Sequence, residues 1–188
     1  MPTITKKSIE KLREKIASAQ VTGKDFVLSS GAKGKDYLDM KGVCLDSESL
    51  YTIAATFIKW MKDMGVSTVG GSALGADPIV GAIVAISTLK PFEHPVNGFI
   101  IRKVLGESGT DKIIEGDIKR GTEAVMVEDV LSAGGSTLRA TRMAQNCGIK
   151  IREVFVVVDK MRGGARKLID AGYSCRSIFT LSSLKQPE

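Results

Sequence analysis

The chain has 188 residues, and its 27 basic and 21 acidic side chains give a formal net charge of +6. Because folded domains typically hold about 100 to 200 residues, we expect a single domain over residues 1–188. Hydrophobic residues make up 43% of the chain and charged residues 26%, which is close to the globular average and excludes a disordered chain, a collagen-like repeat and a coiled coil.

The cysteines and the apolar runs indicate the cellular compartment in which the protein is expected. Cys44, Cys147 and Cys175 are odd in number and have no C-x-x-C spacing, so neither a disulfide framework nor a zinc site is predicted. No apolar run approaches the roughly 20 residues of a bilayer span, and the N-terminus lacks a signal-peptide core. We therefore expect a cytoplasmic protein that does not bind membranes. The positive charge suits an anionic ligand and solvated lysines equally well, while the absence of a recognition motif and the 5% aromatic content argue against nucleic acid.

Taken in chain order, the hydrophobic pattern first predicts an amphipathic helix at residues 5–19 and two short strands at 26–28 and 37–40. A second helix is expected to be capped by Ser47 and to end at Gly65. Strands and helices then alternate, with strands at 66–69, 98–103, 124–127, 154–158 and 177–181 and helices at 78–89, 138–147 and 164–171. This alternation predicts an α/β fold with a parallel central sheet flanked by helices, and a binding site at the carboxyl ends of its strands.

One strand end carries a chemical signal. The expected strand AVMV at 124–127 is followed by Glu128 and Asp129. The small residues SAGGS come shortly after them, at 132–136. Small residues let backbone N–H groups converge on an anion at a helix N-terminus, and the hydroxyls of the two serines and Thr137 can donate further hydrogen bonds. The SAGGS run alone is equally compatible with a glycine turn and a serine cap. Because carboxylates repel a phosphate unless they contact sugar hydroxyls or a divalent cation, the combination favours a sugar phosphate ligand.

The string VEDVLSAGGS at 127–136 resembles the phosphoribosyl pyrophosphate (PRPP) motif of type I phosphoribosyltransferases. Three segments, FVLSSGAKGKDYLDMK at 26–41, GGSALGADP at 70–78 and FIIRKVLGESGTDKIIEG at 99–116, narrow the resemblance to the orotate phosphoribosyltransferase family. The resemblance implies a five-stranded parallel core, a hood at residues 1–45, and a homodimer in which a mobile lid loop at 104–116 reaches the partner subunit. It further implies Mg²⁺ as cofactor and transfer of ribose 5-phosphate from PRPP to orotate, giving orotidine 5′-monophosphate and pyrophosphate in pyrimidine (UMP) synthesis.

The resemblance also assigns roles to single residues. Catalysis is expected from Arg102, Lys103 and Asp129, and no side chain is expected to bind the metal directly. The residues expected to bind PRPP are Arg102, Lys103, Glu128, Asp129, Val130, Leu131, Ser132, Ala133, Gly134, Gly135 and Ser136. A turn of Gly70, Gly71 and Ser72 is expected to offer backbone groups to the pyrophosphate, and Ser132 and Lys160 are expected to bind orotate.

Two departures from the family pattern leave alternatives open. The family usually reads R-K-x-x-K-x-H-G in the lid, whereas Gly106 and Ser108 stand here in place of the second lysine and the histidine. The family commonly shows D-R after the fourth core strand, whereas Lys160 follows the aspartate here, with Arg162 as a second candidate cation. Lysine keeps the charge of arginine but not its planar fork. The alternatives are a phosphoribosyltransferase for a different base and a PRPP-binding regulator with little turnover.

Overall fold

The computed structural model describes residues 4–27, 33–102 and 113–185. The helices are α1 (Lys6–Ser18), α2 (Lys41–Cys44), α3 (Ser47–Met64), α4 (Asp77–Ser87), α5 (Gly135–Asn146), α6 (Gly164–Asp170) and the short 3₁₀ helix η1 (Ser183–Lys185). The strands are β1 (Gln20–Val27), β2 (Lys33–Leu38), β3 (Thr68–Ser72), β4 (Asn97–Ile101), β5 (Ile114–Glu115), β6 (Glu123–Leu131), β7 (Lys150–Asp159) and β8 (Cys175–Thr180). None of the helices in these ranges is long and apolar enough to span a bilayer.

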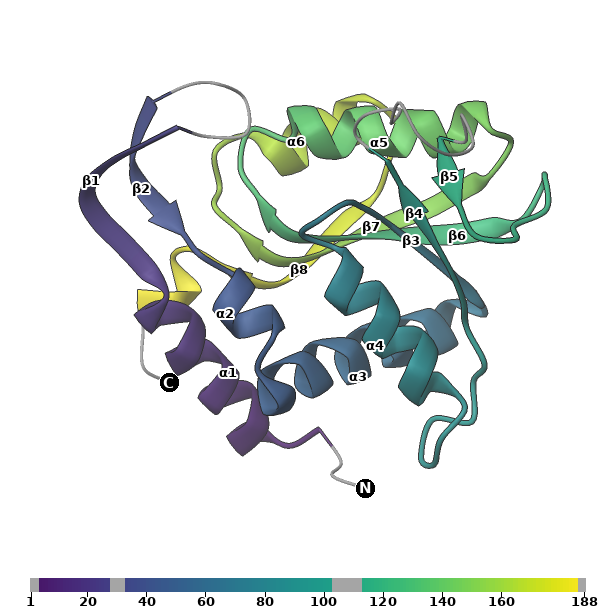
Figure 1. Ribbon diagram of the computed structural model, residues 1–188, viewed down its shortest axis with the longest axis horizontal. Coiled ribbons are helices and arrows are strands. Elements are labelled where there is room, and N and C mark those ends of the chain that lie inside the picture. The colour runs from purple at the N-terminus through teal and green to yellow at the C-terminus, as the bar shows by residue number, and fades with distance from the viewer. Residues whose placement is uncertain (1–3, 28–32, 103–112, 186–188) are drawn as a thin grey trace.

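The main sheet has six strands in the order β5-β4-β3-β6-β7-β8. The five strands from β4 to β8 in this order are parallel to their neighbours, and only β5 pairs antiparallel, with β4. Figure 1 shows α5 and α6 on one face of the sheet and α2, α3 and α4 on the other. The predicted parallel α/β architecture, with its five parallel strands and helices on both faces, is confirmed.

The alternation of side chains along β6 divides the core into two layers. Val125 and Val127 belong to the cluster shared with α3 and α4, whereas Ala124 and Met126 belong to the cluster shared with α5. Successive side chains of a strand point to opposite faces of the sheet, and Val127 is followed by Glu128 and Asp129. The two carboxylates are therefore presented on opposite faces of the sheet.

The N-terminal elements lie beside this sheet. α1 begins at a capping box formed by Thr5 and Ser8, and it buries Leu12 and Ile16 in the core cluster that includes α3. β1 and β2 pair with each other in a separate two-stranded antiparallel sheet (Figure 1). The helix expected at 5–19 is confirmed, and both strands are longer than expected. α2 was not predicted, because four residues are too few to show a helical period.

Two element boundaries differ from the prediction. The helix cap expected at Ser47 is wrong, because Asp46 is the N-cap of α3 and its carboxylate accepts the backbone N–H of Ser49 at 3.0 Å. The predicted end of that helix is confirmed, since Gly65 adopts the left-handed conformation with φ of 67°. The strand expected at 124–127 runs on to Leu131, because the polar residues after it remain in register with β7.

Candidate functional site

The strongest candidate for a ligand site is the loop between β6 and α5. Residues 132–134 leave the sheet, and Gly134 caps α5 in the left-handed conformation with φ of 72° and without a side-chain hydrogen bond to the helix. The first N–H groups of a helix have no partners within the helix, and the macrodipole adds partial positive charge at this end. Ser132, Gly135 and Ser136 are half-buried and Ala133 is exposed, so the loop is accessible. This geometry is compatible with an anion cradle, and the binding of an anion here stays a prediction.

This loop packs directly against the start of α6. A Cβ added to Gly134 would lie 2.8 Å from the Cα of Gly164, and one added to Gly164 would lie 3.0 Å from the backbone nitrogen of Gly134. The backbone N–H of Lys160 donates to the carbonyl of Leu131 at 2.8 Å. The loop after β7 and the loop after β6 are thus held together by backbone contacts, which brings the two predicted orotate-binding loops, those of Ser132 and Lys160, side by side.

Of the two candidate cations after β7, the structure buries one. Lys160 is only 8% exposed, whereas Arg162 is exposed. A buried lysine in the loop beside the one capped by Gly134 is a candidate for binding an anionic group. The geometry therefore favours Lys160 over Arg162.

The two adjacent carboxylates have different neighbours. The hydroxyl of Thr137, in the first turn of α5, donates to Glu128 Oε2 at 2.8 Å. Asp129, on the other face, accepts the backbone N–H of Val130 at 2.8 Å and lies against Gly75 in the turn after β3. The Thr137 hydroxyl is thus bonded to Glu128, and its donation to a bound anion stays a prediction.

The glycines expected in a pyrophosphate-binding turn belong instead to a strand. Gly70, Gly71 and Ser72 are buried in β3, where they pair in parallel with β4, and the turn comprises the next four residues, 73–76. Glycine is needed in the strand because a Cβ at Gly70 would meet the ring of Phe99. The Ala73–Leu74 peptide bond in the turn is cis. The predicted position of the turn is therefore wrong: the turn comprises residues 73–76, and its Gly75 lies against Asp129.

Of the expected basic pair, Arg102 and Lys103, the described residues include Arg102. Arg102 follows β4, donates its backbone N–H to the carbonyl of Ile113 at 3.0 Å, and places Nη1 3.1 Å from Glu115 Oε1. Lys103 and residues 104–112 of the expected lid lie outside the described residues. The remainder of the expected lid forms β5, so its carboxyl end is anchored on the edge of the sheet.

Cys44, on α2, lies on the same side of the sheet as Asp129. The thiol is 2% exposed, and burial, with a smaller contribution from the negative charge of Asp129, raises its pKa to about 12.

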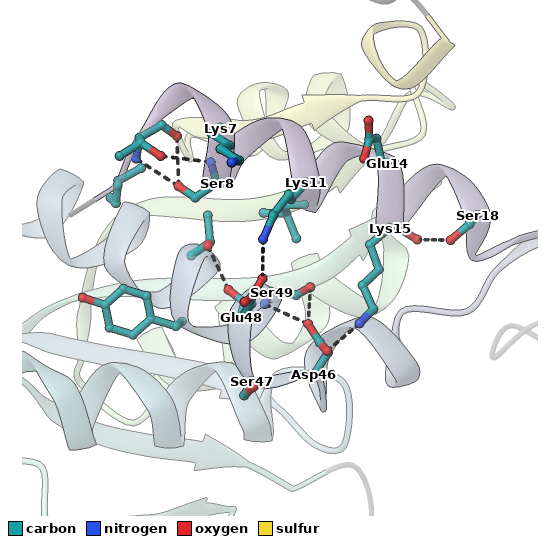
Figure 2. A pocket seen from close by; sticks show the side chains of 15 residues that line it. Lys7, Ser8, Lys11, Glu14, Lys15, Ser18, Asp46, Ser47, Glu48 and Ser49 are labelled. Atoms are coloured by element: carbon teal, nitrogen blue, oxygen red, sulfur yellow. Dashed lines mark hydrogen bonds and ion pairs between the residues drawn. The ribbon is translucent and has the colours of Figure 1, made fainter. Parts of the chain in front are cut away.

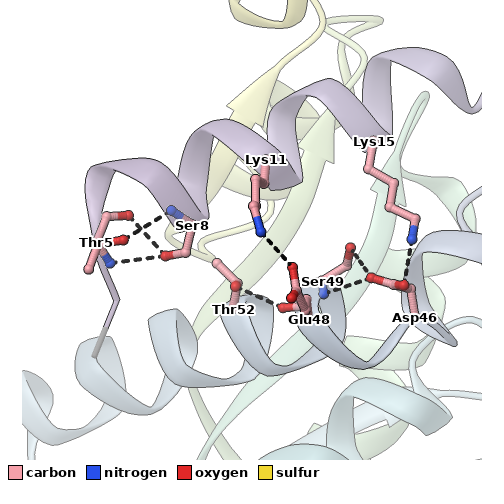
Figure 3. A network of polar contacts seen from close by, with 8 residues as sticks. All are labelled: Thr5, Ser8, Lys11, Lys15, Asp46, Glu48, Ser49 and Thr52. Carbon is pink, nitrogen blue, oxygen red and sulfur yellow. Dashed lines mark hydrogen bonds and ion pairs between the residues drawn. The ribbon is translucent and has the colours of Figure 1, made fainter. Parts of the chain in front are cut away.

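A second hollow, a groove of about 1020 Å³, lies between α1 and α3 (Figure 2). Its rim is closed by ion pairs, in which Lys11 reaches Glu48 at 3.1 Å and Lys15 reaches the helix cap Asp46 (Figure 3). The hydrogen bonds from Lys15 and Ser49 lower the pKa of Asp46 to about 2. Lys11 and Lys15 are thus paired with carboxylates at the start of α3, and these ion pairs join α1 to α3.

The contacts of Gly75, Thr137 and Gly164 with the site were not predicted. Gly75 lies within the segment GGSALGADP that carries the family resemblance, so the sequence contained a signal for it. Nothing in the sequence signals the pairing of Thr137 with Glu128 or of Gly164 with Gly134, because each is a contact across the fold.

Known proteins resemble this chain over most of its length. Orotate phosphoribosyltransferase of Aquifex aeolicus is 34% identical over 176 residues, which cover 94% of this chain and 93% of that protein. The enzyme of the same name from Thermosynechococcus vestitus is 35% identical over 162 residues, covering 86% and 84%. The crystal structure of Mycobacterium tuberculosis orotate phosphoribosyltransferase in complex with PRPP matches with a TM-score of 0.75 at 26% identity, covering 96% of this chain and 93% of that one. No protein-family profile matches the chain.

Proposed function

The chain belongs to the orotate phosphoribosyltransferase family, and from this premise we propose that it transfers the 5-phosphoribosyl group of PRPP to orotate, releasing pyrophosphate, in the synthesis of pyrimidine nucleotides. The observation that carries the proposal is the contact between two loops: the anion cradle capped by Gly134 packs against the loop of the buried Lys160. One loop suits a sugar phosphate and the other suits the carboxylate of a base, at a separation that backbone contacts fix.

The proposed roles follow from these positions. The N–H groups and serine hydroxyls of residues 132–136 bind the 5-phosphate. Asp129 and Glu128 orient the ribose hydroxyls, and Glu128 is itself oriented by Thr137. Lys160, with Ser132, binds the orotate carboxylate. The pyrophosphate lies toward the turn at 73–76 and Ser72, at the end of β3.

Departing negative charge needs nearby cations, which is usually the largest single contribution to such a reaction. Arg102 and Lys103 supply them in this proposal. Because Arg102 contacts Glu115 at 3.1 Å, its guanidinium has to leave or share this partner when the pyrophosphate binds.

Mg²⁺ fits this site as an ion that arrives with the substrate. The described residues contain no group of three or more side chains that could hold a metal. Mg²⁺ commonly keeps several waters and binds together with substrate phosphates. When bound to PRPP, the ion neutralises charge on the pyrophosphate, and no direct protein ligand is required.

A homodimer in which the lid completes the partner's site is part of the proposal. It is tested by mixing two inactive variants, Lys103→Ala and Asp129→Ala, which alter the lid segment and the core site respectively. If the lid acts across the dimer, one of the two sites in a mixed dimer is intact, and mixing restores activity. Without restoration after subunit exchange, each lid serves its own subunit.

The three cysteines are free thiols, in keeping with the reducing, cytoplasmic setting that we also propose.

The proposal is tested by incubating the purified protein with PRPP, Mg²⁺ and a panel of bases while pyrophosphate release is measured. Orotate turnover supports it; turnover with another base alone, or PRPP binding without turnover, refutes it. Lys160→Ala is expected to raise the KM for orotate by about 10- to 100-fold, the value of a hydrogen bond to a charged group. Arg162→Ala is the matched control, two residues away and exposed, and is expected to leave this KM unchanged.

A further inference from the structure

The turn between β3 and α4 contacts the carboxylate of Asp129 through a residue that has no side chain. A Cβ added to Gly75 would lie 2.8 Å from Asp129 Oδ1 and 3.0 Å from both Cγ and Oδ2. Real Cβ atoms do not approach other heavy atoms this closely, so any larger residue at position 75 forces the carboxylate to move.

Backbone conformation does not require glycine at this position. The glycines of the chain with positive φ include Gly65 and Gly134 but not Gly75. An alanine at position 75 would therefore adopt the same φ and ψ angles without the strain of the left-handed region. The close approach of Asp129 is the constraint that remains.

The carboxylate has few other restraints. Among the residues that the structure describes, its hydrogen bond comes from the backbone N–H of Val130 at 2.8 Å. Asp129 is half-buried. A single hydrogen bond from the adjacent residue leaves the carboxylate free to rotate about its side-chain bonds, so the surface of the turn fixes its remaining degree of freedom.

We propose that Gly75 is a positioning residue for Asp129: the space left by its missing side chain holds the carboxylate in the orientation that binds the ribose of PRPP. This inference rests on the proposed function only in the role that it gives to Asp129. It assigns the turn at 73–76 a second task besides facing the pyrophosphate, because Gly75 in this turn sets the geometry on the ribose side.

The contact predicts a loss of function without a loss of fold. In Gly75→Ala the new methyl group displaces the end of one side chain and leaves the backbone in place. The unfolding transition is therefore expected near that of the parent protein. A displacement of about 1 Å at a reacting group can lower the rate by about 10²-fold, and a loss of this order in kcat/KM for PRPP is expected. The matched control is Gly81→Ala in α4, where an added Cβ meets nothing within 4 Å, and its activity is expected to equal that of the parent.

A double-mutant cycle separates this role from a merely structural one. The kcat/KM and the dissociation constant for PRPP are measured for Gly75→Ala, Asp129→Ala and the double variant. If Gly75 acts through Asp129, the methyl group has no carboxylate to displace in the Asp129→Ala background, and it changes either quantity by less than about twofold there. An equal loss in both backgrounds, or parent-like behaviour of Gly75→Ala, overturns the proposal.

The two readouts also distinguish this inference from the proposed function. Turnover of orotate by the parent protein decides the proposed function. PRPP binding measured by calorimetry decides the role of Gly75 whichever base is used, because it requires no turnover.

Discussion

Replacing Gly134 by alanine tests whether backbone contact between the two loops shapes the phosphate cradle. The residue has φ of 72°, and an added Cβ would lie 2.8 Å from Gly164 Cα and 2.9 Å from its carbonyl oxygen. The left-handed conformation costs an alanine roughly 1–2 kcal/mol, and overpacking typically costs a further 1–3 kcal/mol. We expect the free energy of unfolding to fall by about 2–5 kcal/mol, less than the 5–15 kcal/mol typical of a native domain.

Gly65→Ala is the matched control, because Gly65 has a similar φ of 67° but nothing within 4 Å of its Cβ position. It should lose only the conformational part, about 1–2 kcal/mol, in urea unfolding. Calorimetry should show PRPP binding weakened about 10- to 100-fold in Gly134→Ala alone, since only there does the cradle move. Equal losses of stability in the two variants, together with unchanged PRPP binding, would refute the reasoning.

Three further predictions concern single contacts. Thr137→Val should raise the KM for PRPP and lower stability by about 1.5–3 kcal/mol, because it removes the 2.8 Å hydrogen bond to Glu128. Thr137→Ser should retain the parent KM and the parent stability. Parent-like values for Thr137→Val would contradict this prediction. Asp46→Ala should lower stability at pH 7 by about 1 kcal/mol, and Asp46→Asn, which keeps the cap, should lower it by less. Since the pKa of Asp46 is lowered to about 2, its contribution to stability is present above the unfolded-state pKa near 4 and should disappear between about pH 4 and pH 2. A pH-independent difference in stability between Asp46→Ala and the parent would contradict this prediction. Cys44, buried with a pKa raised to about 12, should resist iodoacetamide at pH 8 until the protein is denatured; mass spectrometry of labelled peptides checks this, and equal labelling of native and denatured protein would disprove it.

The sequence was sufficient to predict the elements whose signals are local. The alternation of strands and helices after Gly65 is confirmed in the five parallel strands and in α4, α5 and α6. The loop between β6 and α5 was also predictable, because small residues between a hydrophobic strand and a helix are themselves the local signal. The limits of the strands were less predictable. The resemblance implied a turn at Gly70 and Gly71, but in the fold both lie in β3, where their missing side chains make room for Phe99 and Ala76.

Contacts between segments that are distant in the chain could not be predicted in this way. A hydroxyl in the first turn of a helix can bind a phosphate or a carboxylate, and only the fold reveals that Thr137 donates to Glu128. Asp129 and its neighbour appeared equivalent as an acidic pair, yet the strand directs them to opposite faces, one toward α5 and the other toward Gly75. The same limit applies to Lys160, whose burial distinguishes it from Arg162.

The crowded glycines of the site have a common physical origin. Neighbouring parallel strands lie only about 4.8 Å apart, so the loops that leave their carboxyl ends must pass each other within van der Waals distance. At this edge Gly75 meets Asp129, and Gly164 meets the loop that ends in Gly134. Gly134 and Gly164 let two of these loops touch through their backbones, and a backbone contact transmits a displacement that a flexible side chain would absorb, whereas Gly75 acts on the carboxylate of Asp129. A substitution in any one of the three loops should therefore be felt at a ligand held by another, which the variants of Gly75 and Gly134 test independently.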